Sequence, residues 1–163
     1  LYTSAPVKIG DFCRFGSQYG IVEEIGLRAT RIRTLDRTVL YIANALFVDM
    51  QIENYSERER IAFRPKLKLQ VASKKENVQL LLNDIKSLLS EHEKVSDSPL
   101  RAHFKQFSTL GLELDVLSYV ETVNFEEYLN VINELNLAIL ALLERHECSL
   151  MTVDPRVAEM QAT

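Results

Sequence analysis

The sequence contains no tryptophan, only two cysteines, four prolines and five glycines, and no long apolar run. Cys13 and Cys148 are too few for a disulfide framework and are typical of a reducing compartment, where each is expected to be a small buried hydrophobic residue. The longest apolar run, 137–143, is far shorter than the roughly 20 residues that a membrane-spanning helix needs. The sequence therefore predicts a chain that is not held by disulfides and does not cross a membrane.

A surplus of positive charge is also absent. The 19 lysines and arginines face 23 acidic residues, which gives a formal net charge of −4. Residues 1–60 are balanced, whereas residues 61–163 are acidic. Domains that bind nucleic acid or anionic lipid electrostatically are usually basic. We therefore expect no nucleic-acid partner.

Motifs of catalysis are missing as well. No nucleophile elbow, phosphate-binding glycine loop, dinucleotide fingerprint or metal-ligand spacing is present. The three histidines, His92, His103 and His146, are far apart, and two of them fall near expected helix ends, where the helix dipole favours a cation. The sequence predicts no catalytic residue, metal site or cofactor, and hence no enzyme.

Glycine is concentrated in the first third of the chain, where Gly10, Gly16, Gly20 and Gly26 separate short runs of strand-forming residues. The predicted strands cover 12–15, 21–25, 29–35, 38–42 and 46–52, with a hairpin turn at Asp36 and Arg37. Short strands at this spacing are typical of a small barrel or sandwich.

The remaining residues alternate between strand and helix patterns. A strand is expected over 61–73, a helix after a capping box at Ser73 and Glu76, a hairpin over 101–107 and 112–120, and a helix from Asn124 to about His146. Apolar residues at steps of three and four form one stripe on each helix. The order strand, helix, strand, strand, helix is that of a split βαβ sandwich.

The first unit resembles the small β domain of the small-conductance mechanosensitive channel family. The similarity lies in GDFCRFG, YGIVEEIGLRATRIRTLD, VLYIANALF and IENYSER. The matching positions are Gly10, Asp11, Gly20, Val22, Ile25, Arg28, Thr30, Arg33, Asp36, Ile42, Asn44, Ile52, Asn54 and Ser56. Two positions depart from the family pattern: Ala43 replaces a proline, and Arg37 stands where a hairpin glycine is common, so this turn is expected to be of another type or strained.

The resemblance implies an α+β protein: an Sm-like β barrel or sandwich over residues 1–60, followed by a ferredoxin-like split βαβ domain over 61–163 that ends in a strand or tail. It implies the cytoplasmic vestibule of a tension-gated channel in the cell membrane, assembled as a homoheptamer that passes ions and small solutes and relieves osmotic pressure. The pore helices would precede Leu1, so the chain is expected to be a fragment.

The resemblance also suggests roles for residues outside the β domain. Arg58, Arg60 and Arg64 would lie at the linker and near side portals. Met151, Val153 and Val157, in the tail, would contact neighbouring subunits. The acidic second domain would bias the vestibule towards cations.

The basic residues Arg28, Arg31, Arg33 and Arg37 leave two interpretations open. They could bind phosphate, a lipid headgroup or RNA, or they could be paired with Glu23, Glu24, Asp49 or Glu53 on a solvated or subunit-facing strand. The alternative function is accordingly an Sm-like RNA-binding or scaffold module, which would need a basic rim with stacking aromatic residues such as Tyr19.

Overall fold

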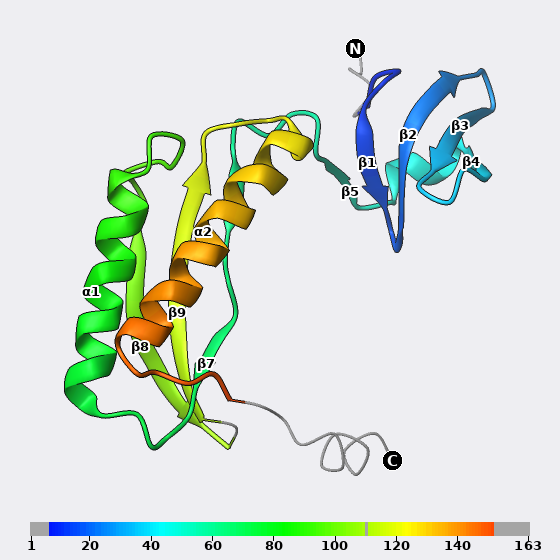
Figure 1. Cartoon of the computed structure of the whole chain (residues 1–163). Coiled ribbons are helices and arrows are strands. Elements are labelled where there is room, and N and C mark those ends of the chain that lie inside the picture. The colour runs from blue at the N-terminus through cyan, green and yellow to red at the C-terminus, as the bar shows by residue number, and fades with distance from the viewer. Residues whose placement is uncertain (1–6, 110, 152–163) are drawn as a thin grey trace. The chain divides into compact units, whose positions relative to one another are not determined.

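The computed structural model describes residues 7–109 and 111–151 and divides the chain into two compact units, Leu1–Arg58 and Glu59–Thr163 (Figure 1). The first is a five-stranded antiparallel β domain and the second a mixed α/β domain. The predicted α+β class is confirmed.

The β domain consists of one antiparallel sheet and a 3₁₀ helix. Its elements are β1 (Phe12–Phe15), β2 (Gln18–Ile25), β3 (Ala29–Thr34), β4 (Val39–Ala43), η1 (Asn44–Val48) and β5 (Ile52–Asn54). The strand order is β4-β3-β2-β1-β5, so β4 and β5 lie at the two edges. A register shift between Val22 and Glu24 marks a bulge in β2, a feature that bends a sheet. The first four strands fall where the sequence predicts them.

The predicted fifth strand over 46–52 is wrong in most of its length. The chain forms η1 first, and β5 begins only at Ile52. Phe47 and Met50 both pack against the core of the β domain. Phe47 lies in η1 and Met50 lies two residues after its end, whereas an extended strand would place side chains three residues apart on opposite faces.

The β3–β4 hairpin turn lies at Asp36 and Arg37, as predicted. The Arg37 backbone N–H donates to the Thr34 carbonyl at 3.0 Å, and Arg37 has φ of 66°. This left-handed conformation is unfavourable for residues with a side chain. The arginine thus occupies a glycine-type position, as its departure from the family pattern suggested.

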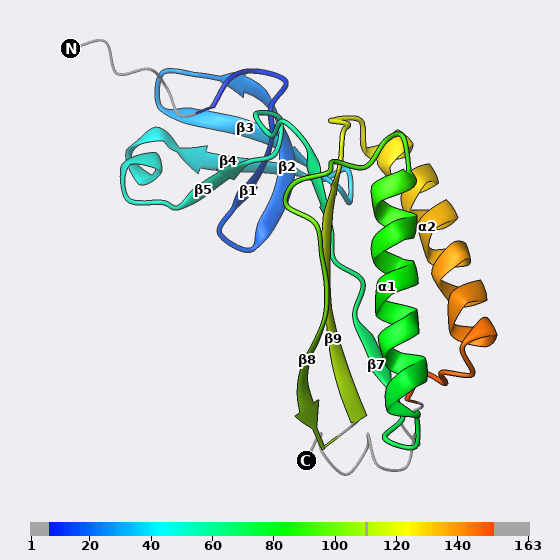
Figure 2. The same ribbon diagram turned by 90° about the vertical axis from the view of Figure 1, so that its left-hand side faces the viewer.

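The second unit is a sheet with two helices on one of its faces (Figure 2). Its elements are β6 (Ile61–Phe63), β7 (Leu67–Leu69), α1 (Lys75–Glu91), β8 (Arg101–Ser108), β9 (Gly111–Val120) and α2 (Phe125–Arg145). The long strand β9 is central and pairs with β6, β7 and β8, in each case antiparallel. The split βαβ order is therefore present, and among the residues that the structure describes, the other face of the sheet carries no helix.

The predicted strand over 61–73 is interrupted and ends early. β6 and β7 pair with the same edge of β9 in continuous register, but they are separated at Pro65, which has no N–H to donate. Val71 was expected on the buried face but is 67% exposed. The chain turns after Gln70, whose carbonyl accepts a hydrogen bond from the Ser73 N–H at 3.1 Å.

The capping box at Ser73 and Glu76 is not formed. Lys74 occupies the N-cap of α1 without a side-chain hydrogen bond, and the Ser73 N–H donates to the Gln70 carbonyl. The second predicted cap is confirmed, since the Asn124 side chain accepts hydrogen bonds from the N–H groups of Glu126 and Glu127.

After α2 the chain returns to the free edge of β7. Leu150 forms an antiparallel bridge with Leu69, and the Met151 N–H donates to the Lys68 carbonyl at 2.8 Å. This segment occupies the place of a fourth strand in a ferredoxin-like sheet. Met151 is 38% exposed there, and Val153 and Val157 lie outside the described residues.

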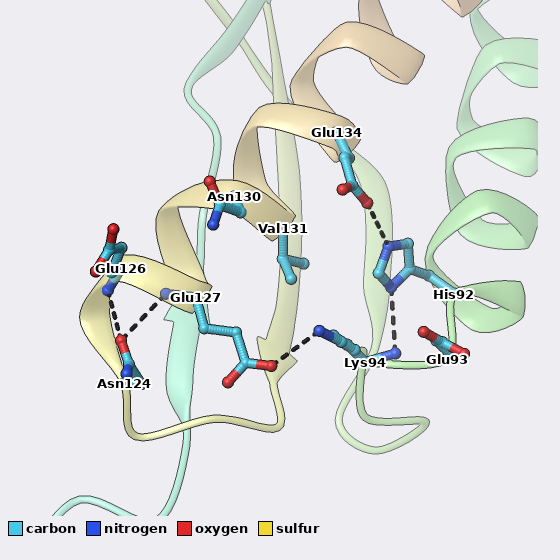
Figure 3. Close-up of a pocket in the computed structure, with 9 residues that line it drawn as sticks. All are labelled: His92, Glu93, Lys94, Asn124, Glu126, Glu127, Asn130, Val131 and Glu134. Carbon is cyan, nitrogen blue, oxygen red and sulfur yellow. Dashed lines mark hydrogen bonds and ion pairs between the residues drawn. The ribbon is translucent and has the colours of Figure 1, made fainter.

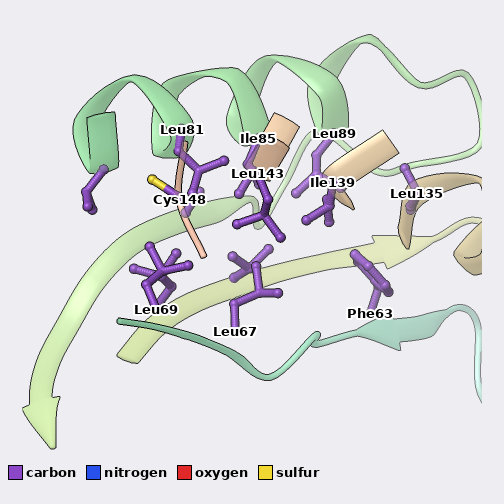
Figure 4. Close-up of a cluster of buried hydrophobic side chains, with 14 of the residues drawn as sticks. Phe63, Leu67, Leu69, Leu81, Ile85, Leu89, Leu135, Ile139, Leu143 and Cys148 are labelled. Atoms are coloured by element: carbon purple, nitrogen blue, oxygen red, sulfur yellow. The ribbon is translucent and has the colours of Figure 1, made fainter. Parts of the chain in front are cut away.

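Both helices bury the stripes that the sequence predicts. Val78, Leu81, Ile85 and Leu89 of α1 are buried, as are Val131, Leu135, Ile139 and Leu143 of α2. They pack on the sheet residues Phe63, Leu67 and Leu69, and Cys148 lies among them (Figure 4). This layer is the main hydrophobic core of the α/β domain.

Candidate functional site

The corner after β4 is held by the side chain of Asn44. Its amide Nδ2 donates to the Gly26 carbonyl at 2.8 Å, and its Oδ1 accepts from the Thr30 hydroxyl at 3.0 Å. The Asn44 backbone N–H donates to the Arg28 carbonyl at 2.9 Å. Thr30 is buried, so its hydroxyl depends on a protein partner. One side chain therefore joins the start of η1 to the β2–β3 turn, and we call this the Asn44 clasp.

A second group of family-motif residues joins the two ends of the β domain. The Asp11 carboxylate accepts from the Asn54 side chain at 2.8 Å and from the Lys8 N–H at 2.9 Å. The Ser56 hydroxyl accepts from the Phe12 N–H at 2.9 Å, and the Ser56 N–H donates to Asn54 Oδ1. We call Asp11, Asn54 and Ser56 the Asp11 clasp. It brings together residues more than 40 positions apart.

The two motif glycines have different physical roles. Gly10 has φ of 95°, and its N–H donates to the Val22 carbonyl at 2.8 Å. Gly20 has no unusual φ, but a Cβ there would lie 2.5 Å from the Ile32 side chain and 2.7 Å from the Arg33 carbonyl oxygen. Gly10 is therefore required by conformation and Gly20 by the close approach of β3.

The basic residues of β3 are paired. Arg33 donates from Nε and Nη2 to the two Glu23 oxygens at 2.8 and 3.1 Å, and Arg31 Nε lies 3.1 Å from the same carboxylate. The hydrogen bond from Arg33 holds the pKa of Glu23 below its usual value. Glu24 lies 3.9 Å from Arg31. Arg31 and Arg33 are therefore paired with Glu23 and Glu24, as one of the two interpretations of the basic residues requires.

The other acids proposed as partners do not take that role. The Glu53 carboxylate accepts from Arg14 at 2.6 Å, and Asp49 makes no ion pair among the described residues. Arg28 and Arg37 are exposed, and Tyr19 packs against Phe12 and Tyr55. The basic rim that an RNA-binding surface would need is thus partly neutralised.

The three arginines predicted at the linker lie in different environments. The Arg60 guanidinium donates to the Ser96 hydroxyl at 2.8 Å and to the Ser98 carbonyl at 3.0 Å, and it lies 4.7 Å from the centre of the Tyr119 ring. Arg58 lies 6.0 Å from the Tyr55 ring centre. Arg64 is exposed beside the break between β6 and β7. Within the second unit, Arg60 and Arg64 therefore have different surroundings.

A polar pocket of about 360 Å³ lies where the end of α1 meets the start of α2 (Figure 3). Lys94 donates to the Glu127 carboxylate at 2.8 Å, and the Thr122 hydroxyl donates to its other oxygen at 2.6 Å. The hydrogen bond from Lys94 holds the pKa of Glu127 below its usual value, with Thr122 adding to the effect. His92 Nε2 lies 3.6 Å from a Glu134 oxygen. These contacts fasten the loop after α1 to α2.

The described residues around this pocket do not form a metal site. Within residues 7–109 and 111–151, no group of three or more histidine, cysteine or acidic side chains could hold a metal ion. His146 Nε2 contacts Asp84 of α1 at 2.8 Å, a contact that joins the two helices, and His103 lies on β8 opposite Asp115. In the same part of the chain, no helix combines the length and apolar character needed to span a bilayer.

Sequence reasoning missed most of the long-range partners. The contacts of Arg60 with Ser96, Ser98 and Tyr119, and of Lys94 with Glu127, join positions that no local pattern connects. Only the charge and alternation of each strand indicated that Arg31 and Arg33 need partners on a neighbouring strand.

Both units match models of known protein families. Residues 1–57 match the family model described as the mechanosensitive ion channel beta-domain, and residues 68–150 match the model of the C-terminal part of the mechanosensitive ion channel MscS. The small-conductance mechanosensitive channel MscMJ of Methanocaldococcus jannaschii is 34% identical over 140 residues, which cover 86% of this chain and 40% of that protein. The large-conductance channel MscMJLR of the same organism is 30% identical over 148 residues, covering 89% and 41%.

A solved structure is similar in fold to nearly the whole chain. The cryo-EM structure of Arabidopsis thaliana MSL1 matches with a TM-score of 0.83 and 26% identity, covering 92% of this chain and 55% of that one. The chain spans about two fifths of the length of the curated relatives above.

Proposed function

Because this chain belongs to the MscS family of mechanosensitive ion channels, we propose that its two domains form part of the cytoplasmic vestibule of a tension-gated channel in the cell membrane. The channel opens when membrane tension favours the state with the larger in-plane area, and it then releases ions and small solutes under osmotic stress. The vestibule admits these solutes and holds back larger ones.

The observation that carries this proposal is the order of the two matched domains. The β domain and the C-terminal domain follow one another in a single chain, and both match models of the same channel family. The likeness to MSL1 covers 92% of the chain and therefore includes most of both domains. An isolated Sm-like RNA-binding or scaffold module would not require the second domain.

The assembly proposed is a homoheptamer. We also propose that the functional boundary between the domains lies between residues 60 and 61, two residues after the division at Arg58, and that Arg58, Arg60 and Arg64 flank side portals near it. Among the tail residues proposed to contact the next subunit, Met151 has an exposed side chain that could do so. Relatives named for small and for large conductance are similar to this chain to nearly the same degree, so the likeness assigns no conductance.

The test is tension-activated current from the full-length protein that contains this chain. The purified protein is reconstituted in liposomes, and suction is applied to excised patches. We expect single-channel openings that appear only above a threshold tension, and the same preparation without protein is the control. Patches that reach their rupture tension with no channel opening would contradict the proposal.

The heptameric assembly is tested separately by light scattering behind a sizing column. The 163-residue chain should elute as a particle of about seven times 18.7 kDa if its own surfaces hold the ring. The full-length protein in detergent should have a detergent-corrected mass of seven subunits. A different mass for the full-length protein would overturn the heptamer while leaving the current measurement valid.

A further inference from the structure

The two faces of the α/β domain carry charge of opposite sign. Helices α1 and α2 together contain seven acidic and three basic residues. The opposite, open face of the sheet carries more basic than acidic residues. The basic ones are Arg64, Lys66, Lys68, Arg101 and Lys105, and the acidic ones are Glu113 and Asp115. The α/β domain is therefore negative overall but has one basic face.

The residues of this face are placed there by strand alternation. Leu67 and Leu69 of β7 are buried beneath the helices, so Lys66 and Lys68 point to the open face. Register pairs Lys68 with Glu113 on β9, which brings the acidic residues of β9 between the basic residues of β7 and β8. A hollow of about 410 Å³ lies over these strands and is lined by Arg64, Lys66, Lys68, Lys105, Glu113 and Asp115, among others.

The two acidic side chains of the hollow already contact basic side chains of the same domain. The Glu113 carboxylate lies 2.9 Å from Lys68 Nζ and accepts a hydrogen bond from Gln106 at 2.9 Å. Asp115 lies 3.4 Å from Arg101 Nε. Both carboxylates are thus matched by their own cations, which weakens their repulsion of an anion.

Three basic side chains of the hollow remain without such a partner. Arg64, Lys66 and Lys105 are exposed and form no ion pair with any residue of 7–109 or 111–151. Arg64 and Lys66 lie in the break between β6 and β7, on one side of β9, and Lys105 lies on β8, on its other side. An anion placed over β9 could meet cations from both sides. A multivalent anion can satisfy several of them at once, whereas chloride cannot.

We propose that this hollow binds small multivalent oxyanions, the class that includes polyphosphates and polycarboxylates. Arginine recognises planar oxyanion groups through its fork of N–H donors, and lysine acts as a compact point charge, so the set suits phosphate and carboxylate oxygens alike. The inference does not depend on the proposed channel role, because it follows from the charges of this domain alone.

The test is isothermal titration of the intact protein with pyrophosphate and, in a separate arm, with citrate. Ionic strength is held constant with sodium chloride, because exposed charges are screened. We expect saturable binding, weakened at least tenfold in the triple variant Arg64→Gln, Lys66→Gln and Lys105→Gln. Binding of both probes supports a site for oxyanions in general, and binding of one alone supports the site and identifies its preferred group.

The matched control removes three exposed lysines from the helical side of the same domain. The triple variant Lys74→Gln, Lys75→Gln and Lys86→Gln changes the net charge by the same amount, and its affinity should stay within about twofold of wild type. Equal losses in both variants would mean that only net charge matters and would overturn the proposal. So would the absence of saturable heat with either probe. Thermal unfolding of each variant checks that the fold is intact.

Discussion

The two domains are stabilised by different kinds of interaction. Among the described residues, the α/β domain buries eighteen apolar side chains in one cluster, whereas the β domain buries six. The small β core is supplemented by two sets of side-chain hydrogen bonds, the Asn44 clasp and the Asp11 clasp. A domain with little apolar surface to bury depends more on polar groups that fix its loops, since small cores contribute limited stability.

Each domain carries its own reporter for testing this difference. Cys13 is buried in the β domain and Cys148 in the core of the α/β domain. Burial raises the pKa of the Cys13 thiol to about 11, with Asp11 and Glu57 adding to the effect, and burial also raises the pKa of Cys148. Because the thiolate is the reactive form, labelling should follow the opening of each domain separately.

The largest effect is expected from shortening a core residue of α1. Leu81→Ala removes a fully buried side chain and should lower the unfolding free energy of the α/β domain by about 2–5 kcal/mol. Chemical denaturation followed by thiol labelling and mass spectrometry is the measurement. Cys148 should become reactive at lower denaturant, and Cys13 should respond less.

The control for this substitution is its neighbour on the same helix. Leu80 is 51% exposed, so Leu80→Ala should change the unfolding free energy by no more than about 0.5 kcal/mol. A loss for Leu80→Ala as large as for Leu81→Ala would mean that packing in this core does not dominate the domain.

A smaller but still clear effect is expected when the Asn44 clasp is removed. Asn44→Ala leaves the Gly26 carbonyl and the buried Thr30 hydroxyl without their partner, which should lower the unfolding free energy of the β domain by about 1–3 kcal/mol. Cys13 labelling and the thermal midpoint report this loss.

The double variant Asn44→Ala with Thr30→Val tests the cause. Valine replaces the unpaired hydroxyl by a methyl group of similar size, so part of the loss should be recovered. Full stability in Asn44→Ala would show that the clasp contributes nothing and that the two domains do not differ in this respect.

The smallest expected effect is a loss of folding stability at acidic pH, and we expect this kind of loss in both domains. Glu127 has a lowered pKa because Lys94 donates to its carboxylate. Its contribution to stability is present above its ordinary pKa of 4.5 and is lost as pH falls through the lower folded value. Wild type should therefore lose more α/β-domain stability between pH 6 and pH 3 than Glu127→Gln does.

Urea denaturation across this pH range measures the difference. Glu126→Gln is the control, since its carboxylate lies in the same helical turn but makes no side-chain hydrogen bond within residues 7–109 and 111–151. Parallel pH profiles for wild type and Glu127→Gln would exclude a stabilising role for the contact with Lys94.

Much of the fold could be predicted where local pattern and tertiary packing agree. The stripes of both helices, the β8–β9 hairpin, the first four strands and the Asn124 cap are present as expected. The segment 46–52 could not be assigned correctly, because Leu46 to Ile52 favours a strand by composition. The Asn44 clasp fixes the corner before it, and Phe47 and Met50 both pack against the core, which a strand would prevent because it places them on opposite faces.

Some features of the candidate sites could be predicted from the sequence, and others depend on the tertiary structure. The resemblance identified the motif residues of the β domain, but only the structure shows that Asp11 is joined with Asn54 and Thr30 with Asn44. The basic hollow could not be foreseen from composition, because the domain is acidic as a whole and the sign of each face depends on strand register.

The sequence by itself determined where both helices and most strands occur, because apolar periodicity acts within a few positions of the chain. It also determined the family, through a motif pattern spread over residues 10–56. Only the tertiary structure decided which polar groups meet across each sheet and which face of the α/β domain is basic. These depend on contacts between positions tens of residues apart, and no local free-energy preference encodes such contacts.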